Sequence, residues 1–194
     1  MDKPCFMASE QWQAMILTAD DAESLQAFMA ENPLYSQIVD GRPFLPGEAL
    51  SAITERPPYP HSAAHSLAVV ETDSQRWLGY VSLAQDLIAP GVCHIGLFLV
   101  ATALHGTGLA AQVYAALEQR VQQDGARWMR LGVVLGNARA ERFWARMGFV
   151  EVRKRHGMPY EGPSTTVRVM CKPLHGQSLD AYLALVERDR PDAP

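Results

Sequence analysis

Apolar residues recur along this chain with two different spacings, which separate helices from strands. Apolar residues three to four positions apart predict helices over 21–32, 110–121, 138–147 and 178–188. Short apolar runs predict strands over 14–17, 66–71, 77–84, 93–100, 128–135, 149–154 and 165–172. Pro46 and Pro57 enclose a further short helix over 47–55. A meander of strands followed by alternating strands and helices predicts an α/β fold with a mixed sheet.

Capping residues support two of these helices. Asn137 precedes the helix that carries Ala140, Phe143 and Trp144, and Ser178 precedes the last amphipathic helix. Both side chains accept hydrogen bonds from a first helical turn. The tail after residue 187 has no such pattern, so we expect it to be frayed.

The composition is typical of a globular protein. Its 194 residues and 48% hydrophobic content predict one domain, over 1–194, with a normal core. A net charge of −4 gives no basic footprint for nucleic acid. The start resembles no secretory signal and no run is long enough for a membrane span, so we expect a cytoplasmic protein without membrane partners. The scattered cysteines (Cys5, Cys93 and Cys171) predict neither disulfides nor a zinc site.

The segment from His105 to Ala110, His-Gly-Thr-Gly-Leu-Ala, lies between a predicted strand and a predicted helix. Gly106 and Gly108 allow a tight turn in which several N–H groups converge. The following helix has unpaired N–H groups and a positive dipole end, which suit a diphosphate. A plain turn is the alternative. The segment lacks the Gly-Lys-Ser/Thr of a Walker loop, and Asp124 lies at a helix end rather than where a Rossmann fold needs an acidic residue.

Together, two motifs resemble those of the GNAT superfamily of acyl-CoA-dependent N-acyltransferases. The family's Arg/Gln-x-x-Gly-x-Gly/Ala loop is similar to His105–Ala110. Its Asn at a strand end, followed by Phe-Tyr-x-x-x-Gly-Phe, is similar to Asn137 and Phe143-Trp-Ala-Arg-Met-Gly-Phe149. The resemblance covers about 66–174 and leaves the C-terminal helix, about 178–188, as an addition.

The resemblance implies a mixed, mostly antiparallel sheet of six to seven strands, flanked by helices and splayed between the strands at 93–100 and 128–135. Coenzyme A would occupy the splay. Its pantetheine arm would pair with the strand edge at Leu99 and Val100, and Asn137 would approach the arm. Phe143 and Trp144 would flank the thioester, and Arg146 could reach a phosphate, although an exposed helix arginine is the simpler interpretation. The diphosphate would bind the loop residues His105, Gly106, Thr107, Gly108, Leu109 and Ala110.

Two departures from the family pattern bear on mechanism. His105 replaces the frequent Arg or Gln, which removes a long donor but leaves the backbone clamp. Trp144 replaces the usual Tyr, and an indole N–H is not a useful acid near neutral pH. Tyr160, in a loop that lies near the acceptor in similar proteins, is a candidate acid; water could also protonate the thiolate.

For the catalytic base the sequence offers two candidates. His94 lies on the strand before the loop, where similar enzymes often carry an acidic base, and an unperturbed imidazole titrates near pH 6.5. A packed strand histidine is the alternative. Glu71, at the end of a neighbouring strand, is the second candidate. His61 and His65 lack a third ligand, so we expect no metal.

We therefore expect an N-acetyltransferase that moves an acetyl group from acetyl-CoA to a primary amine by direct attack in a ternary complex. The acceptor is a small-molecule or peptide amine; aminoglycosides, polyamines, amino acids and protein N-termini all stay open. The alternative is a CoA-binding module that has lost catalysis. The C-terminal helix could also serve assembly, for example of a homodimer.

Overall fold

The computed structural model describes residues 3–158 and 164–193, and its centre is an eight-stranded sheet. The strands lie in the order β1-β2-β3-β4-β5-β6-β8-β7. Their bounds are β1 Cys5–Ala8, β2 Trp12–Ile16, β3 Ala63–Glu71, β4 Trp77–Gln85, β5 Val92–Val100, β6 Trp128–Val134, β7 Val150–Arg155 and β8 Val167–Pro173.

Six of the seven strand pairs are antiparallel, and β5 with β6 is the parallel pair. The predicted mixed, mostly antiparallel sheet is therefore confirmed. The predicted number of strands was too low because β1 was missed. That strand has only four residues, of which the two central ones are buried, so it carries no alternating pattern to find.

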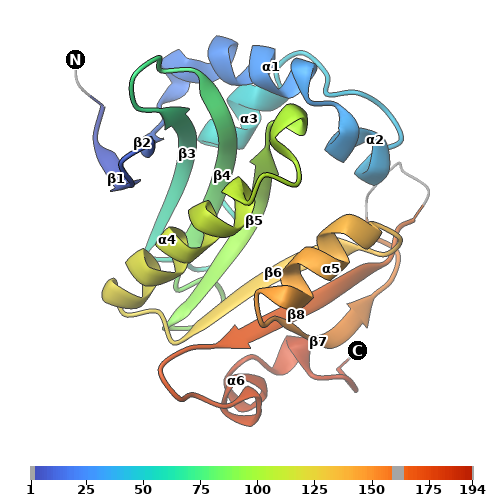
Figure 1. The fold of residues 1–194 in the computed structure, drawn as a ribbon. Helices are drawn as coiled ribbons and strands as arrows, with labels where there is room; N and C mark the ends of the chain where they lie inside the picture. Colours follow the sequence, from blue (N-terminus) through green and yellow to red (C-terminus); the bar gives the residue numbers. More distant parts are fainter. Residues whose placement is uncertain (1–2, 159–163, 194) are drawn as a thin grey trace.

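Helices cover both faces of the sheet (Figure 1). On one face, α4 (Leu109–Gln123) and α5 (Ala138–Arg146) pack against the strands. On the other face lie α1 (Ala22–Glu31) and α3 (Glu48–Thr54), with α2 (Leu34–Val39) between them in the chain. The apolar stripe of α4 accounts for its position, since Val113, Leu117 and Val121 are buried in the main core.

The C-terminal segment packs under β6 and β8 on the face opposite α4 and α5. The Ser178 side chain caps α6 (Leu179–Leu185), as predicted, and its carbonyl accepts a hydrogen bond of 3.0 Å from Trp128 Nε1. The expectation of a frayed tail is wrong. A short 3-10 helix, Glu187–Asp189, follows α6 and buries Asp189 completely.

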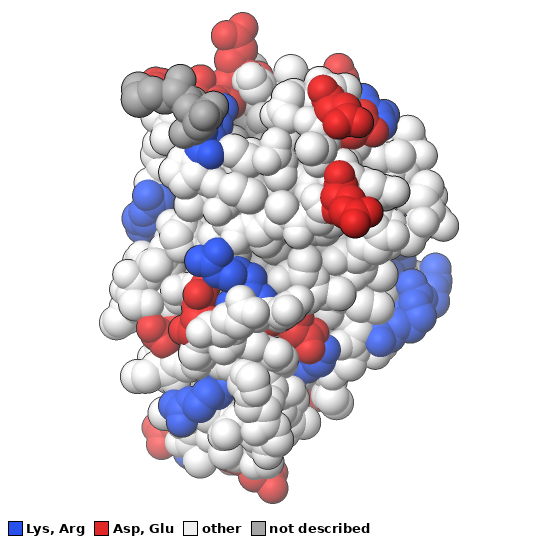
Figure 2. Space-filling view, turned by 60° about the vertical axis from the view of Figure 1, so that its left-hand side comes forward, with Lys and Arg blue, Asp and Glu red and all other residues white. Residues whose placement is uncertain are grey.

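Charged side chains of both signs are scattered singly or in small groups over the mostly uncharged face in Figure 2. That face has no continuous basic surface of the kind that follows a nucleic-acid backbone. Within residues 3–158 and 164–193, no helix combines the length and the apolar character of a membrane span.

Candidate functional site

The parallel pairing of β5 with β6 stops halfway along both strands. Val92–Ile95 pairs with Trp128–Leu131, and no pair follows Ile95 and Leu131. Glycine occupies the next position on each strand, where a Cβ at Gly96 or Gly132 would come within 2.9 Å of a neighbouring side chain. A pocket of about 580 Å³ lies where the strands separate. The predicted splay is confirmed.

One edge of β5 faces this pocket. Backbone groups of alternate residues on an antiparallel strand point to opposite sides. Ala101 N donates to Leu78 O on the β4 side (2.8 Å), and the Leu99 carbonyl lies against Gly79 of β4. Val100 instead directs its carbonyl away from β4, toward His105 Nε2 at 3.0 Å. Of the two predicted edge residues, Val100 therefore faces the splay and Leu99 turns its backbone to β4.

The glycine loop closes one end of the pocket with open backbone donors. Gly106 and Gly108 have φ angles of +85° and +92°, which glycine adopts without strain. Within the described chain, the amides of Gly106, Gly108 and Ala110 have no hydrogen-bond acceptor. The Thr107 amide lies 3.4 Å from Leu104 O, and the Leu109 amide lies 3.4 Å from Thr107 Oγ1. The loop thus presents donors at the N-terminus of α4, where an anion binds favourably.

His105 links the loop to the other side of the splay. Its Nε2 donates to Val100 O, and its Nδ1 contacts the Arg139 guanidinium on α5. Burial lowers the pKa of His105, and Arg139 lowers it further. The neutral ring joins the end of β5 to the start of α5. Arg139, which the sequence motifs do not single out, therefore lies beside the loop that we expect to bind phosphates.

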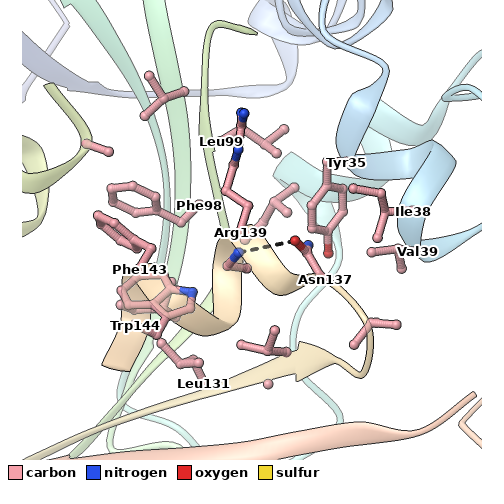
Figure 3. Close-up of a pocket in the computed structure, with 18 of the residues that line it drawn as sticks. Tyr35, Ile38, Val39, Phe98, Leu99, Leu131, Asn137, Arg139, Phe143 and Trp144 are labelled. Atoms are coloured by element: carbon pink, nitrogen blue, oxygen red, sulfur yellow. Dashed lines mark hydrogen bonds between the residues drawn. The ribbon is translucent and has the colours of Figure 1, made fainter. Parts of the chain in front are cut away.

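The α5 residues form the opposite wall. Asn137 caps the helix, as predicted, by accepting a hydrogen bond of 3.2 Å from Ala140 N. Phe143 stacks on Phe98 of β5 at 5.9 Å, and Trp144 meets the same ring edge-on at 5.4 Å. Arg146 lines the pocket and has no hydrogen bond within the described residues. Figure 3 shows Phe143 and Trp144 across the pocket from α2.

His94 lines the pocket, but its surroundings do not suit a catalytic base. Its Nδ1 lies 3.2 Å from Arg130 Nη1, and since arginine only donates, Nδ1 is the acceptor. Burial lowers the pKa of His94 to about 3, and the positive charge of Arg130 contributes. The expectation of an imidazole that titrates near neutral pH is therefore wrong. A base this weak cannot take a proton effectively from an ammonium group.

Arg130 itself belongs to a buried ion pair. Its Nε and Nη2 donate to the two carboxylate oxygens of Asp189 at 2.6 and 3.0 Å. Tyr182 Oη donates to the same carboxylate at 2.5 Å. These contacts hold the pKa of Asp189 below its usual value although burial opposes the shift. The C-terminal segment therefore fixes Arg130, and through it the tautomer of His94.

The two other predicted catalytic residues are not in this pocket or not described. Glu71 pairs at the surface with Ser74 Oγ at 2.5 Å and Arg76 Nη2 at 3.2 Å, and it does not line the pocket. This contradicts its role as a base near the acceptor. Tyr160 lies outside the described residues.

The part of the pocket remote from the glycine loop was not predicted from the sequence. Figure 3 shows side chains of α2 pointing into it. Its lining includes Tyr35, Ile38, Val39, Arg130, Arg155, Met158, Val167 and Val169. These residues come from four separate elements and a loop, so no local motif announces them.

Among the described residues, the cysteines and histidines form no nucleophilic or metal-binding centre. Burial raises the pKa values of Cys93 and Cys171 to about 12, so neither thiol forms a nucleophile at neutral pH. Within the described ranges, no group of three His, Cys, Asp or Glu side chains could hold a metal ion.

Comparisons with known proteins agree with this architecture. The profile of the Acetyltransferase (GNAT) family matches residues 35–149, more than half of the chain, and the chain belongs to that family. The match begins well before the motif-bearing region, so it includes all of α2 except Leu34. No curated protein sequence matches significantly.

Solved structures share the fold at low identity. A probable GNAT-family acetyltransferase from Chromobacterium violaceum has a TM-score of 0.72 and 19% identity, covering 89% of this chain and 87% of its own. An acetyltransferase from Thermus thermophilus has a TM-score of 0.67 and 20% identity, covering 84% and 97%. A Salmonella typhimurium acetyltransferase that modifies the N-terminal serine of ribosomal protein L7/L12 has a TM-score of 0.71 and 13% identity, covering 88% and 99%. The protein is thus a GNAT-type acetyltransferase.

Proposed function

We propose that the protein transfers the acetyl group of acetyl-CoA to a primary amine, with both substrates bound at once. The observation that carries this proposal is the end of β5–β6 pairing at Ile95 and Leu131, beside a loop with open amides. The pocket between the strands reaches from the glycine loop to α2, so it has room for a cofactor arm and an acceptor.

In this proposal the amides of Gly106, Gly108 and Ala110 bind the diphosphate. The backbone of Val100 offers an edge to the pantetheine arm, because its groups face away from β4. Phe98, Phe143 and Trp144 form an apolar surface that excludes water from the thioester. Arg139 and Arg146 add positive charge near the phosphates.

The chemical step is a direct attack. The lone pair of the neutral amine forms a bond to the thioester carbonyl carbon, the carbonyl oxygen takes the negative charge, and the C–S bond then breaks to release thiolate. Backbone N–H donors on β5 stabilise the oxyanion, each by about 3–4 kcal/mol when well placed. The amine gives up a proton to water, and the thiolate is protonated from water, since the indole of Trp144 is no acid.

Positive charge at the pocket helps to keep the amine neutral. The charge of Arg130 is balanced by Asp189, but Arg155 also lines the pocket, and positive charge nearby lowers the pKa of an ammonium group. Because a larger fraction of the amine is then neutral, the reaction depends less on a protein base. This effect also explains why a histidine with a strongly lowered pKa is compatible with catalysis.

The test is a thiol-release assay over a panel of primary amines. Amine-dependent release of coenzyme A, together with a mass increase of one acetyl group on the amine, is the expected result. A second function, CoA binding without catalysis, is the alternative because Trp144 replaces the family's tyrosine. If acetyl-CoA binds tightly and no amine is acetylated, the protein is a CoA-binding module instead.

A further inference from the structure

The acceptor end of the pocket combines apolar and cationic side chains. Tyr35, Ile38 and Val39 from α2 lie on one side, and Met158 and Val167 lie near them. Two arginines, Arg130 and Arg155, also line it. Among the described lining residues there is no aspartate or glutamate. The surface therefore suits an apolar body but offers no counter-charge to a second cationic group.

Arg155 is the exceptional member of this set. It is the last residue of β7 and is half-buried, yet it has no hydrogen bond and no ion pair within the described residues. Burial lowers the pKa of its guanidinium, and the charges of Arg188 and Arg130 lower it further. A partly desolvated cation without a partner is unfavourable, so an anion there would be bound favourably.

The neighbouring charges do not satisfy Arg155. Asp189, a buried carboxylate close enough to affect it, is held by two hydrogen bonds from Arg130 and one from Tyr182. Arg188 lies 4.3 Å above the ring of Tyr59 and adds another positive charge. Asp189 and Arg130 cancel, so the described residues leave the acceptor end positive.

His94 adds an uncharged donor to the same pocket. Because Nδ1 accepts from Arg130, the hydrogen of the neutral ring is on Nε2. His94 lines the pocket, and a hydrogen bond between its ring and the Arg130 backbone opposes the lowering of its pKa. In this tautomer Nε2 carries the hydrogen that can be donated to an oxygen of a bound molecule, and Arg130 fixes the tautomer.

We propose that the acceptor is a free amino acid with an apolar side chain, whose carboxylate pairs with Arg155 and accepts from His94 Nε2. This inference rests on the proposed acetyl transfer to an amine. It disfavours polyamines and aminoglycosides, because their additional ammonium groups would face arginines without a carboxylate. It also disfavours peptide N-termini, whose first residue has an amide in place of the carboxylate.

The test uses matched acceptors and one matched control variant. We expect kcat/KM for phenylalanine to exceed that for phenylalaninamide and phenethylamine by about tenfold or more, and spermidine to be poorer still. In Arg155→Gln this preference should fall to within about threefold, mainly through a higher KM for phenylalanine. Lys154→Gln removes the same charge one residue away, on a side chain that is exposed and does not line the pocket, and should keep the preference.

A binding measurement makes the result decisive when turnover is low. With coenzyme A present, N-acetylphenylalanine should bind more tightly than N-acetylphenethylamine to the wild type and to Lys154→Gln, but not to Arg155→Gln. Equal binding of the two products, or a preference that survives in Arg155→Gln, would overturn the inference. Amine acetylation without a carboxylate preference would leave the proposed function intact, whereas failure to bind acetyl-CoA would remove the proposed function itself.

Discussion

The two halves of the β5–β6 pair have opposite properties although they belong to the same two strands. In the first half, Val92 and Trp128 are buried, and Arg130 is sealed by its ion pair with Asp189. In the second half the strands separate, Gly96 is exposed, and Phe98 lies half-buried at the pocket. The first half, called the closed half below, holds the strands together. The second half, called the open half, leaves backbone groups and aromatic rings free for ligands.

This contrast shows how a sheet can be opened without losing its stability. The buried Arg130–Asp189–Tyr182 contacts lie below the opening, on the face covered by α6. The glycines at 96 and 132 follow the last paired residues, where a side chain would collide with Ser82 or Val167. Binding and folding energies are thus concentrated in different parts of one strand pair.

The largest expected effect is a loss of stability caused by a substitution at the ion pair of the closed half. Asp189→Asn leaves Arg130 buried without its counter-charge, which typically costs about 3–5 kcal/mol. Denaturant unfolding should show a loss of this size, and His94 should lose its fixed tautomer. Glu187→Gln, a change at an exposed residue of the same short helix, is the control. A loss in Asp189→Asn no larger than in the control would show that the ion pair does not hold the strands.

Acidification should weaken the same half through His94. Its folded-state pKa, about 3, lies below the unfolded value near 6.5, so only the unfolded state takes up this proton between those pH values. The stabilisation is complete above pH 6.5 and is lost as the pH falls, by at most about 1.4 kcal/mol per pH unit. His65 and His105 have smaller shifts of the same sign, so the contribution of His94 is the difference between the wild type and His94→Asn.

Unfolding midpoints measured from pH 7.5 to 4.5 check this prediction. The wild type should lose stability more steeply than His94→Asn. His156→Asn changes an exposed histidine and is the matched control. The ionised Asp189 resists protonation until lower pH, because its pKa is below the usual value, so it cannot cause a loss that begins near pH 6.5. Parallel curves for the wild type and His94→Asn would contradict the assignment.

A third prediction concerns the open half and acetyl-CoA affinity. Gly108→Ala places a Cβ at a φ of +92°, so the loop must shift to relieve the strain, and the three open amides lose their alignment. We expect about a tenfold weaker affinity, equivalent to about 1.4 kcal/mol. Gly125→Ala imposes the same strain at φ +93°, at the other end of α4 and outside the pocket. It should reduce stability without changing the affinity.

The smallest expected effect is at Glu71. Its carboxylate pairs with Ser74 and Arg76 at the surface and does not reach the pocket. Glu71→Gln should therefore change neither kcat/KM nor its pH dependence. A clear fall in kcat would restore Glu71 as a catalytic group.

The sequence predicts the cofactor end better than the acceptor end, for a physical reason. The glycine loop, the Asn137 cap and the Phe143-Trp144 pair are local features whose spacing follows from the loop and helix they build. The acceptor end is assembled from α2, β6, β7 and β8, which contact one another only after folding. Arg155 is a strand residue with no distinctive neighbour in the sequence, so its lack of a partner among the described residues is visible only in three dimensions.

His94 illustrates the same limit. Its position on β5 was predictable from the alternation of the strand, but its pKa depends on Arg130, 36 residues away, and on Asp189. Asp189 lies in the tail that lacks any periodic pattern and is nevertheless completely buried. Polar contacts between residues so far apart along the chain leave no periodic signal in a sequence.

The most direct test of the open half is backbone hydrogen exchange measured with and without acetyl-CoA. We expect slower exchange in peptides covering Gly96–Val100 and His105–Ala110, and little change in Trp128–Leu131, which is already paired. Unchanged exchange in both pocket peptides at saturating acetyl-CoA would contradict the claim that coenzyme A binds between β5 and β6.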